Sequence, residues 1–273
     1  MSDPELSIVV PTRNEEGNIP VLLDRIDAAL AGLAYEVVFV DDSDDRTPEV
    51  VEEQARAGRP VRLVHREGRD RAGGLATAVV RGFTEARGRY IASLDADLQH
   101  PPEKLRDLVA ALADADVAVA SRHVPGGSAG GLEGPVRRLG SPAARLLAQA
   151  LLPRARLSTD PLGGFFALRR VVVEGVTLRP IGFKILLEVL VRGRVGKVAE
   201  VAYTFQSRHA GRSKASPRQM WLYLRHIARL RFGDERAVGM VAASVGLSLI
   251  GTALGMLLGR ARRRGPLYRK ISR

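Results

Sequence analysis

The feature that most constrains the fold is a regular alternation of short apolar runs and longer amphipathic stretches over residues 6–121. The apolar runs have the Val and Ile content of buried parallel strands. Strands are expected at residues 6–11, 36–41, 61–65, 90–95 and 117–121. Helices are expected between them, near residues 19–31, 48–57, 74–87 and 103–114. This order predicts an α/β fold with a doubly wound, mainly parallel sheet.

Polar residues gather directly after four of these strands. They are residues 12–15, residues 41–45, the pair Asp95 and Asp97, and the pair Ser121 and Arg122. Because ligands of such sheets bind at the carboxyl ends of the strands, we expect one site there. No Gly-x-Gly-x-x-Gly follows the first strand and no Gly-Lys-Ser/Thr occurs, which argues against a dinucleotide site and a P-loop. Asn14 and Glu15 can instead hydrogen-bond a base or a ribose.

The stretch Ser-Leu-Asp-Ala-Asp-Leu-Gln-His-Pro-Pro at residues 93–102 brings two carboxylates to the tip of the fourth strand. In an extended backbone, Asp95 and Asp97 point to the same side, and Gln99 repeats the spacing. Two carboxylates and an amide oxygen suit a hard cation such as Mg²⁺ or Mn²⁺. An isolated Asp-x-Asp is more often a solvated acidic turn, so the remaining motifs have to decide.

Charge divides the chain into two unlike parts. Residues 1–121 hold 14 basic and 23 acidic residues, a net charge of −9, whereas residues 122–273 hold 28 and 7, a net charge of +21. The basic part is expected to face something anionic, such as lipid headgroups or phosphates. The chain has no cysteine, which excludes disulfides and thiolate metal sites. Residues 1–5 lack the apolar core of a secretory signal.

The basic part also contains amphipathic and apolar stretches. Helices are expected at residues 142–152 and 220–232, the second with arginines and the single tryptophan on an otherwise apolar helix, as at a membrane interface. Residues 237–259 carry no charge and, at about 1.5 Å per residue, span about 34 Å, enough for a hydrocarbon core of about 30 Å. A buried core helix is the alternative. The tail beyond carries seven Lys and Arg residues, which conflicts with the positive-inside tendency if the residues before the span are cytoplasmic.

Several motifs together resemble glycosyltransferase family 2, and more narrowly its polyprenyl-phosphate mannosyltransferases. The residues that carry the resemblance are 9–18 (VVPTRNEEGN), 40–43 (VDDS), 95–103 (DADLQHPPE), 121–127 (SRHVPGG), 160–167 (DPLGGFFA), 182–188 (GFKILLE) and 208–214 (RHAGRSK). The match covers roughly residues 6–235, with the motifs in order. The resemblance implies a GT-A fold, which agrees with the predicted sheet, and transfer of a sugar from a nucleotide sugar to dolichyl or polyprenyl phosphate.

The resemblance also implies the roles of particular residues. Asp97 and Gln99 would bind the metal, and the catalytic set would be Asp95, Asp97, Arg208 and Lys214. The nucleotide sugar would be held by Pro11, Arg13, Glu15, Val40, Asp42, Asp95, Ala96, Asp97, Arg122, Lys184, Arg208 and Lys214. The acceptor phosphate would meet Arg122, Arg137 and Arg138, beyond a glycine-rich loop at residues 126–131 that is otherwise a plain linker. Lys184 lies in the first turn of an expected helix at 182–192, where a cation opposes the helix dipole, and this favours a phosphate contact. The loop carrying Arg208, Arg212 and Lys214 follows an expected strand at 197–205.

The expected organisation is a catalytic domain at 1–216, an interface helix at 217–235, a transmembrane helix at 236–260 and a basic tail at 261–273. The expected donor is GDP-mannose, and the expected place is a membrane, with the catalytic domain on its cytoplasmic face. Gly251, Gly255 and Gly259 have the small-residue spacing of paired transmembrane helices and would allow a homo-oligomer.

Three other functions are considered on the sequence. Transfer of the sugar to a polysaccharide or a small molecule would need a catalytic base, and residues 122–273 offer no compelling one. A polyprenyl-phosphate glucosyltransferase using UDP-glucose would have the same scaffold, and no residue distinguishes guanine from uracil. A basic nucleic-acid-binding protein would explain the charge of the second part. It would not explain the apolar segment or the acidic strand tips, so no nucleic-acid partner is expected.

Overall fold

The computed structural model describes residues 3–131, 135–207, 217–233, 237 and 239–240, with the backbone alone at 135–140 and 217. Within these residues, seven strands form one sheet in the order β3-β2-β1-β4-β6-β5-β7. Their bounds are β1 Leu6–Thr12, β2 Tyr35–Asp41, β3 Val61–His65, β4 Tyr90–Ser93, β5 Val117–Ser121, β6 Phe166–Arg169 and β7 Val198–Ala202. The pairs β1–β2, β1–β4, β2–β3 and β5–β7 are parallel. β6 runs antiparallel between β4 and β5, so the sheet is mixed.

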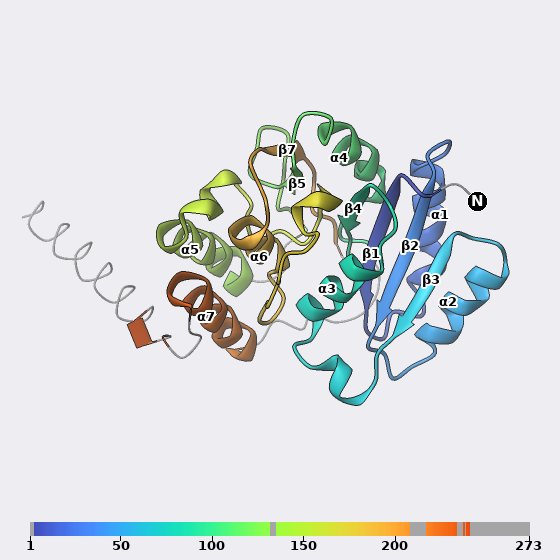
Figure 1. The fold of residues 1–273 in the computed structure, drawn as a ribbon, viewed down its shortest axis with the longest axis horizontal. Coiled ribbons are helices and arrows are strands. Elements are labelled where there is room, and N and C mark those ends of the chain that lie inside the picture. Colours follow the sequence, from blue (N-terminus) through green and yellow to red (C-terminus); the bar gives the residue numbers. More distant parts are fainter. Residues whose placement is uncertain (1–2, 132–134, 208–216, 234–236, 238, 241–273) are drawn as a thin grey trace, which may run out of the picture.

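The helices flank this sheet on both faces (Figure 1). The α-helices are α1 Ile19–Ala29, α2 Thr47–Arg56, α3 Leu75–Glu85, α4 Leu105–Ala111, α5 Pro135–Leu151, α6 Ile185–Arg192 and α7 Pro217–Phe232. Short 3-10 turns are η1 Gly68–Arg71, η2 Pro102–Lys104, η3 Pro153–Leu157 and η4 Arg170–Val172. The first four helices confirm the predicted alternation within one to three residues, except that η2 and α4 divide the stretch predicted as one helix.

Alternate residues of each strand enter two different apolar cores, as the two faces of a sheet require. Ile8 and Phe39 pack with α1, α2 and α4 on one face. Val9 and Val38 pack with α3 and α6 on the other. Both sets are fully buried, so the carboxyl ends of β1, β2 and β4 are held in fixed positions by a packed framework.

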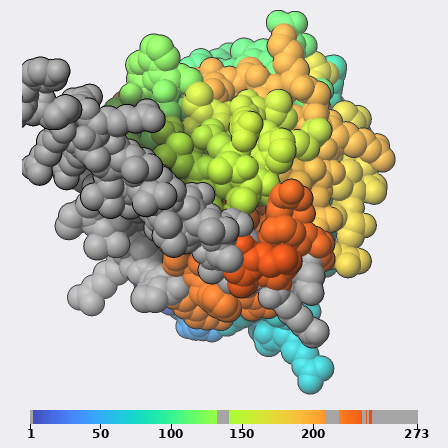
Figure 2. All heavy atoms as spheres, turned by 90° about the vertical axis from the view of Figure 1, so that its left-hand side faces the viewer, coloured from blue at the N-terminus to red at the C-terminus, as the bar shows by residue number. Residues whose placement is uncertain are grey.

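A third apolar cluster lies at the end of the molecule away from β3. It joins α5, η3, α6 and α7 through side chains that include Ala148, Leu187, Tyr223 and Ile227. Figure 2 shows α5 in yellow-green and α7 in orange next to each other on this face. Among the residues that the structure describes, no helix is both long enough and apolar enough to cross a bilayer. The expected span lies almost entirely outside them, and so do the basic tail and Gly251, Gly255 and Gly259.

Two strand predictions were wrong in extent. The strand expected at residues 90–95 ends at Ser93, where the chain turns, and the strand expected at 197–205 is reduced to β7. Beyond β7 a single bridge joins Ser128 to Thr204, which brings the glycine-rich loop against the chain that follows β7. The helix expected at 142–152 begins earlier, at Pro135, so Pro142 lies inside α5.

Candidate active site

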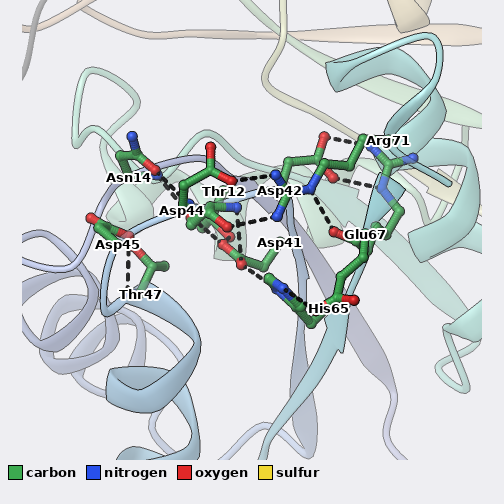
Figure 3. Close-up of polar contacts among 12 residues, drawn as sticks. Thr12, Asn14, Asp41, Asp42, Asp44, Asp45, Thr47, His65, Glu67 and Arg71 are labelled. Atoms are coloured by element: carbon green, nitrogen blue, oxygen red, sulfur yellow. Dashed lines mark hydrogen bonds and ion pairs between the residues drawn. The ribbon is translucent and has the colours of Figure 1, made fainter. Parts of the chain in front are cut away.

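The carboxyl ends of β1 and β2 form one polar edge (Figure 3). Asp41 is fully buried and accepts hydrogen bonds from Thr12 Oγ1 at 2.7 Å, from Ser43 Oγ at 2.5 Å and from Ser43 N at 3.1 Å. His65 Nδ1 lies 2.7 Å from the second carboxylate oxygen and donates to it, since an ionised carboxylate only accepts. Four bonds to one buried carboxylate satisfy it without a ligand, so Asp41 shapes the edge.

Asp42, the neighbour that the family resemblance assigns to the nucleotide sugar, is paired with Arg66. Two hydrogen bonds of 2.8 and 2.6 Å join the guanidinium to the carboxylate, and the two side chains are only 6% and 10% exposed. Arg71 continues the network by donating to the carbonyl oxygens of Arg66 and Ser43 at 2.7 and 2.8 Å. A bidentate pair fixes the planes of the guanidinium and the carboxylate, and the role of Asp42 toward the nucleotide sugar stays a prediction.

The loop after β1 is tied to the loop after β2. Asn14 adopts a left-handed backbone with φ of 57°, its N–H donates to Ser43 Oγ at 2.8 Å, and its side-chain oxygen accepts from Asp44 N at 3.0 Å. The N–H of Glu15 donates to Thr47 Oγ1 at 2.9 Å. Arg13 lies 4.0 Å from Asp44 with a largely exposed side chain. Pro11 and Val40 are register partners with buried side chains, so neither side chain faces solvent.

The Asp95-to-Gln99 stretch is a turn, and the extended backbone predicted for it was wrong. The N–H of Gln99 donates to Asp97 Oδ1 at 3.1 Å, a local bond that competes with a strand, and Leu98 has φ of 62°. Gln99 Nε2 donates to the carbonyl of Gln206 at 3.2 Å, which fixes the plane of the amide and the position of its oxygen. Ala96, between the two carboxylates, is buried.

His100 is buried behind this turn in an aromatic box. Its ring stacks on Phe165 with centroids 5.4 Å apart and lies 5.9 and 5.5 Å from Tyr203 and Phe205. Its Nδ1 is 3.6 Å from Asp95 Oδ2, beyond hydrogen-bond distance. Burial lowers the pKa of His100 to about 4, so the ring is neutral at pH 7. A Cβ at Gly164 would lie 3.3 Å from Asp95 Oδ2, so this glycine lets the backbone approach the carboxylate.

Arg122, expected to contact phosphate, forms a buried pair with Asp160. The Nε–Oδ2 and Nη2–Oδ1 distances are 2.7 and 2.8 Å, and the guanidinium lies over the ring of Phe205 at 5.6 Å. The loop carrying Asp160 is fixed in turn by Glu200, which accepts from Ser158 Oγ at 2.8 Å. The charge of Arg122 is thus compensated within the protein, and its role toward phosphate stays a prediction.

Lys184 lies just before α6 and not inside its first turn, because the helix begins at Ile185. Its Nζ donates to the carbonyl of Leu162 at 2.8 Å and lies 4.5 Å from the ring centre of Phe183. Leu162 stands two residues before Gly164, whose backbone lies against the Asp95 carboxylate. The loop that binds Lys184 Nζ is therefore the loop that contacts the acidic turn.

Some of the predicted residues cannot be placed. Arg208, Arg212 and Lys214 lie outside the described residues, and nothing is described of the side chains of Arg137 and Arg138 in α5. Sequence reasoning missed Arg66, Asp160 and His100. The sequence contained a partial indication, because His100 and Asp160 lie within the motifs quoted above. It did not show their partners, which come close only in the folded protein.

The residues at the turn fit a divalent cation whose other ligands come from a substrate. Asp97 and Gln99 supply hard oxygen donors, with the partly exposed carboxylate of Asp95 beside them. Among the described residues, no group of three or more His, Cys, Asp or Glu side chains could hold a metal ion by itself. This donor set is typical of Mg²⁺ or Mn²⁺ bound together with phosphates and not of an all-protein metal cage.

Comparisons with solved structures define the class of this fold. A glucosyl-3-phosphoglycerate synthase from Mycobacterium tuberculosis, solved in complex with Mn²⁺, UDP-glucose and glycerol 3-phosphate, superposes with a TM-score of 0.58 at 25% identity. The superposition covers 83% of this chain and 79% of that one. A mannosyl-3-phosphoglycerate synthase from Rubrobacter xylanophilus superposes with a TM-score of 0.59, covering 83% and 73%, at 22% identity. The mixed sheet is therefore that of the GT-A glycosyltransferases.

The family follows from sequence. Residues 7–176 match glycosyl transferase family 2, and the chain belongs to this family. A dolichol-phosphate mannosyltransferase of Pyrococcus furiosus is 45% identical over 247 residues, which cover 89% of this chain and 69% of that protein. One of Saccharomyces cerevisiae is 35% identical over 249 residues, covering 86% and 91%. An undecaprenyl-phosphate mannosyltransferase of Micrococcus luteus is 32% identical over 220 residues, covering 76% and 86%. The predicted family and subtype are confirmed.

Proposed function

We propose that this protein transfers mannose from GDP-mannose to dolichyl or another polyprenyl phosphate, giving a lipid-linked mannosyl phosphate. The observation that carries the proposal is the 45% identity, over 89% of the chain, to a relative named for dolichol phosphate and mannose. The geometry supports it. The turn with Asp95 and Asp97 and the polar edge with Asp42 both lie at the carboxyl ends of strands, and Lys184 is bound by the loop that contacts this turn. GDP-mannose is the donor that the family resemblance implies.

Asp97 and Gln99 would hold Mg²⁺ or Mn²⁺, with Asp95 adjacent. When bound, the ion supplies positive charge that stabilises the leaving nucleoside diphosphate. Support comes from the donor set at the turn and from the solved relative whose complex contains Mn²⁺ with a nucleotide sugar. The described carboxylates are too few to fill the coordination shell of the ion. This fits an ion whose remaining ligands are diphosphate oxygens of the donor.

The protein's own groups would act by position and charge. Asp42, held by Arg66, would orient the nucleoside, and Arg13 and Glu15 would line the same edge. Lys184, Arg208 and Lys214 would add positive charge around the phosphates. The nucleophile is a phosphate oxygen, which is anionic at neutral pH, so no general base is required, and in-line attack predicts inversion at the anomeric carbon.

A membrane is the proposed setting, with the catalytic domain on its cytoplasmic face. Support comes from apolar side chains of α5 and α7 that are exposed: Leu146, Met220 and Trp221 are exposed by 61%, 48% and 53%. Arginines of α7 accompany these apolar side chains, a combination typical of interfacial helices. Residues 237–259 would add a transmembrane anchor, and Gly251, Gly255 and Gly259 a contact for a homo-oligomer.

A panel of labelled nucleotide sugars with polyprenyl phosphate tests the function. We expect label from GDP-mannose to enter the organic phase after solvent extraction, and little label from UDP-glucose. Transfer from UDP-glucose alone would support the glucosyltransferase alternative. No extractable label from any donor, with an active relative as positive control, would contradict the proposal.

A further inference from the structure

The loop that delivers Lys184 is held at its beginning by α6 and α7. The N–H of Arg179 donates to Glu188 Oε1 at 2.7 Å, and the carbonyl oxygen of the same residue accepts from Arg229 Nη1 at 3.2 Å. Glu188 belongs to α6 and Arg229 to α7. Both polar backbone groups of one loop residue are therefore bound by side chains from two helices that are far apart in sequence.

Glu188 connects these two helices directly. Its second oxygen lies 2.7 Å from His226 Nε2 of α7, and both side chains are fully buried. Arg192 Nε lies 3.0 Å from Oε1. Burial alone would raise the pKa of Glu188, but the bonds from His226 and Arg179 hold it below its usual value, so the group stays ionised. Removing one partner of a buried carboxylate strongly destabilises a protein. We therefore expect the contacts that Glu188 makes with α7 and the loop to be rigid.

The other end of the loop is fixed as well. Gly182 has φ of 81°, and a Cβ there would lie 3.2 Å from Leu222 Cβ of α7. Its carbonyl accepts from Ala76 N of α3 at 3.1 Å. Two residues later, Lys184 Nζ reaches the carbonyl of Leu162. The segment from Arg179 to Lys184 thus contacts α7 along its length and ends at the loop that carries Leu162.

We propose that α7 positions Lys184, with His226 acting through Glu188 on the loop from Arg179 to Lys184. This inference rests on the proposed function, in which Lys184 contacts the phosphates of the donor. The surface helix α7 then contributes to the donor site. When His226 fixes the position of α7, the loop holds Lys184 in place, and a displacement of α7 would displace the loop and Lys184.

Apolar packing alone does not explain this arrangement. Tyr223, Ile227 and Ala228 bury one side of α7 against α5 and α6, and this packing contributes to the attachment of the helix. Non-directional packing leaves a helix free to rotate or slide slightly, whereas a buried hydrogen-bonded pair has one geometry. The pair therefore specifies the register of α7 against the loop.

A double-mutant cycle between His226 and Lys184 tests the proposal in the full-length protein. We expect His226→Ala to lower kcat/KM for GDP-mannose about tenfold, and by less than about twofold when Lys184 is already alanine, because both changes remove one interaction. His226→Gln keeps a donor near the Nε2 position and should restore most of the activity. GDP-mannose affinity, measured by calorimetry without acceptor, should show the same coupling.

Tyr223→Phe is the matched control. Tyr223 is a buried residue of α7, and its hydroxyl donates to the carbonyl of Ala144 in α5 at 2.5 Å, away from the Lys184 loop. This variant loses one buried hydrogen bond of the same helix, so it should lower the melting temperature without coupling to Lys184→Ala. If Tyr223→Phe couples as strongly as His226→Ala, His226 acts only through general stability and the proposal fails.

The remaining outcomes separate this inference from the proposed function. Additive effects of His226→Ala and Lys184→Ala overturn the inference, and so does a Lys184→Ala variant with wild-type kinetics and affinity. If His226→Ala does not fold, the cycle is run with His226→Gln and His226→Asn, and additivity there overturns it equally. A protein that binds GDP-mannose but forms no lipid product contradicts the proposed function. In that case the double-mutant cycle measured by GDP-mannose affinity still tests whether α7 positions Lys184.

Discussion

The guanidinium of Arg122 and the carboxylate of Asp160 form a bidentate pair beneath the candidate active site, with N–O distances of 2.7 and 2.8 Å. Their side chains are 10% and 2% exposed. Arg122 is the first residue after β5, and Asp160 lies in the loop that leads to β6, so the pair joins two loops of the site. Because both groups are buried, each needs the other to compensate its charge, and the pair is a structural requirement of the site.

Replacing Asp160 by asparagine is expected to destabilise the protein by about 3 to 5 kcal/mol, because it leaves Arg122 buried without an opposite charge. Urea unfolding at pH 7 measures this. Asp107→Asn is the control: Asp107 pairs with Lys104 at 2.8 Å, but both side chains are substantially exposed, so its loss should cost about 1 kcal/mol or less. Equal effects of the two substitutions would show that burial does not matter.

The same pair predicts how stability depends on pH. Burial alone would raise the pKa of Asp160, but the hydrogen bonds and the charge of Arg122 together hold it below its usual value. A depressed folded-state pKa stabilises the protein fully above the unfolded value of about 3.9, and this stabilisation is lost as the pH falls through the folded value. The difference in unfolding free energy between wild type and Asp160→Asn should therefore shrink from pH 6 toward pH 3. A constant difference would contradict the ionised pair.

Strict dependence on a divalent metal is expected for sugar transfer. EDTA should abolish activity and excess Mg²⁺ or Mn²⁺ should restore it. The reason is that Asp97 and Gln99 supply only part of the metal's ligands, and diphosphate oxygens of the donor would supply the rest. Asp97→Ala should lower turnover about a hundredfold or more while leaving the melting temperature nearly unchanged. Asp114→Ala, at an exposed carboxylate, is the control. Full activity in excess EDTA would rule out the metal role.

The Asp42–Arg66 pair should govern recognition of the donor and not of the acceptor. Arg66→Lys keeps the charge but loses the planar bidentate contact, so we expect KM for the nucleotide sugar to rise about tenfold with KM for the lipid unchanged. Arg25→Lys removes a bidentate contact of 2.8 and 2.8 Å to Glu103 on the outside of the protein, and should leave both constants unchanged. A rise in both KM values for Arg66→Lys would indicate a general loss of structure.

Much of the fold was predictable because the first five strands are local apolar runs whose residue types indicate burial. β6 was not, because Phe166–Arg169 is short and becomes a strand only by pairing with β4 and β5, which are distant in sequence. The turn at Asp95 was expected to be extended, since alternation in sequence does not show that the Asp97 carboxylate bonds its own backbone.

The candidate site was predictable where residue types carry the chemistry and not where tertiary pairing does. Asp42 and Asp97 stand in acidic motifs after strands, which made them candidates from sequence alone. Arg66 stands 24 positions after Asp42, and Asp160 stands 38 after Arg122, so only the folded sheet shows that each pair is bound. Sequence gives the position of a charge along the chain but not its partner.

Trp221 offers a direct test of the proposed membrane contact of α7. It is the only tryptophan of the chain and its side chain lies on the exposed face of α7, so its emission reports on this helix alone. With vesicles containing anionic lipid, we expect a blue shift and quenching by brominated acyl chains, because the ring would enter the headgroup boundary. Nearby arginines should contribute about 1 kcal/mol each to the attraction, so the response should be weaker on neutral vesicles.

A protein ending near Asp234 separates this contact from the expected apolar anchor. Its Trp221 emission should still shift on anionic vesicles, but high salt should reverse its binding, whereas the full-length protein should float with vesicles at any salt concentration. Leu146→Asp, at an apolar residue of α5 that is 61% exposed, should weaken binding of the shortened protein without changing its melting temperature. If the full-length protein is released by salt as easily, residues 237–259 are not an anchor. If it floats while Trp221 emission stays unchanged, α7 does not face the lipid.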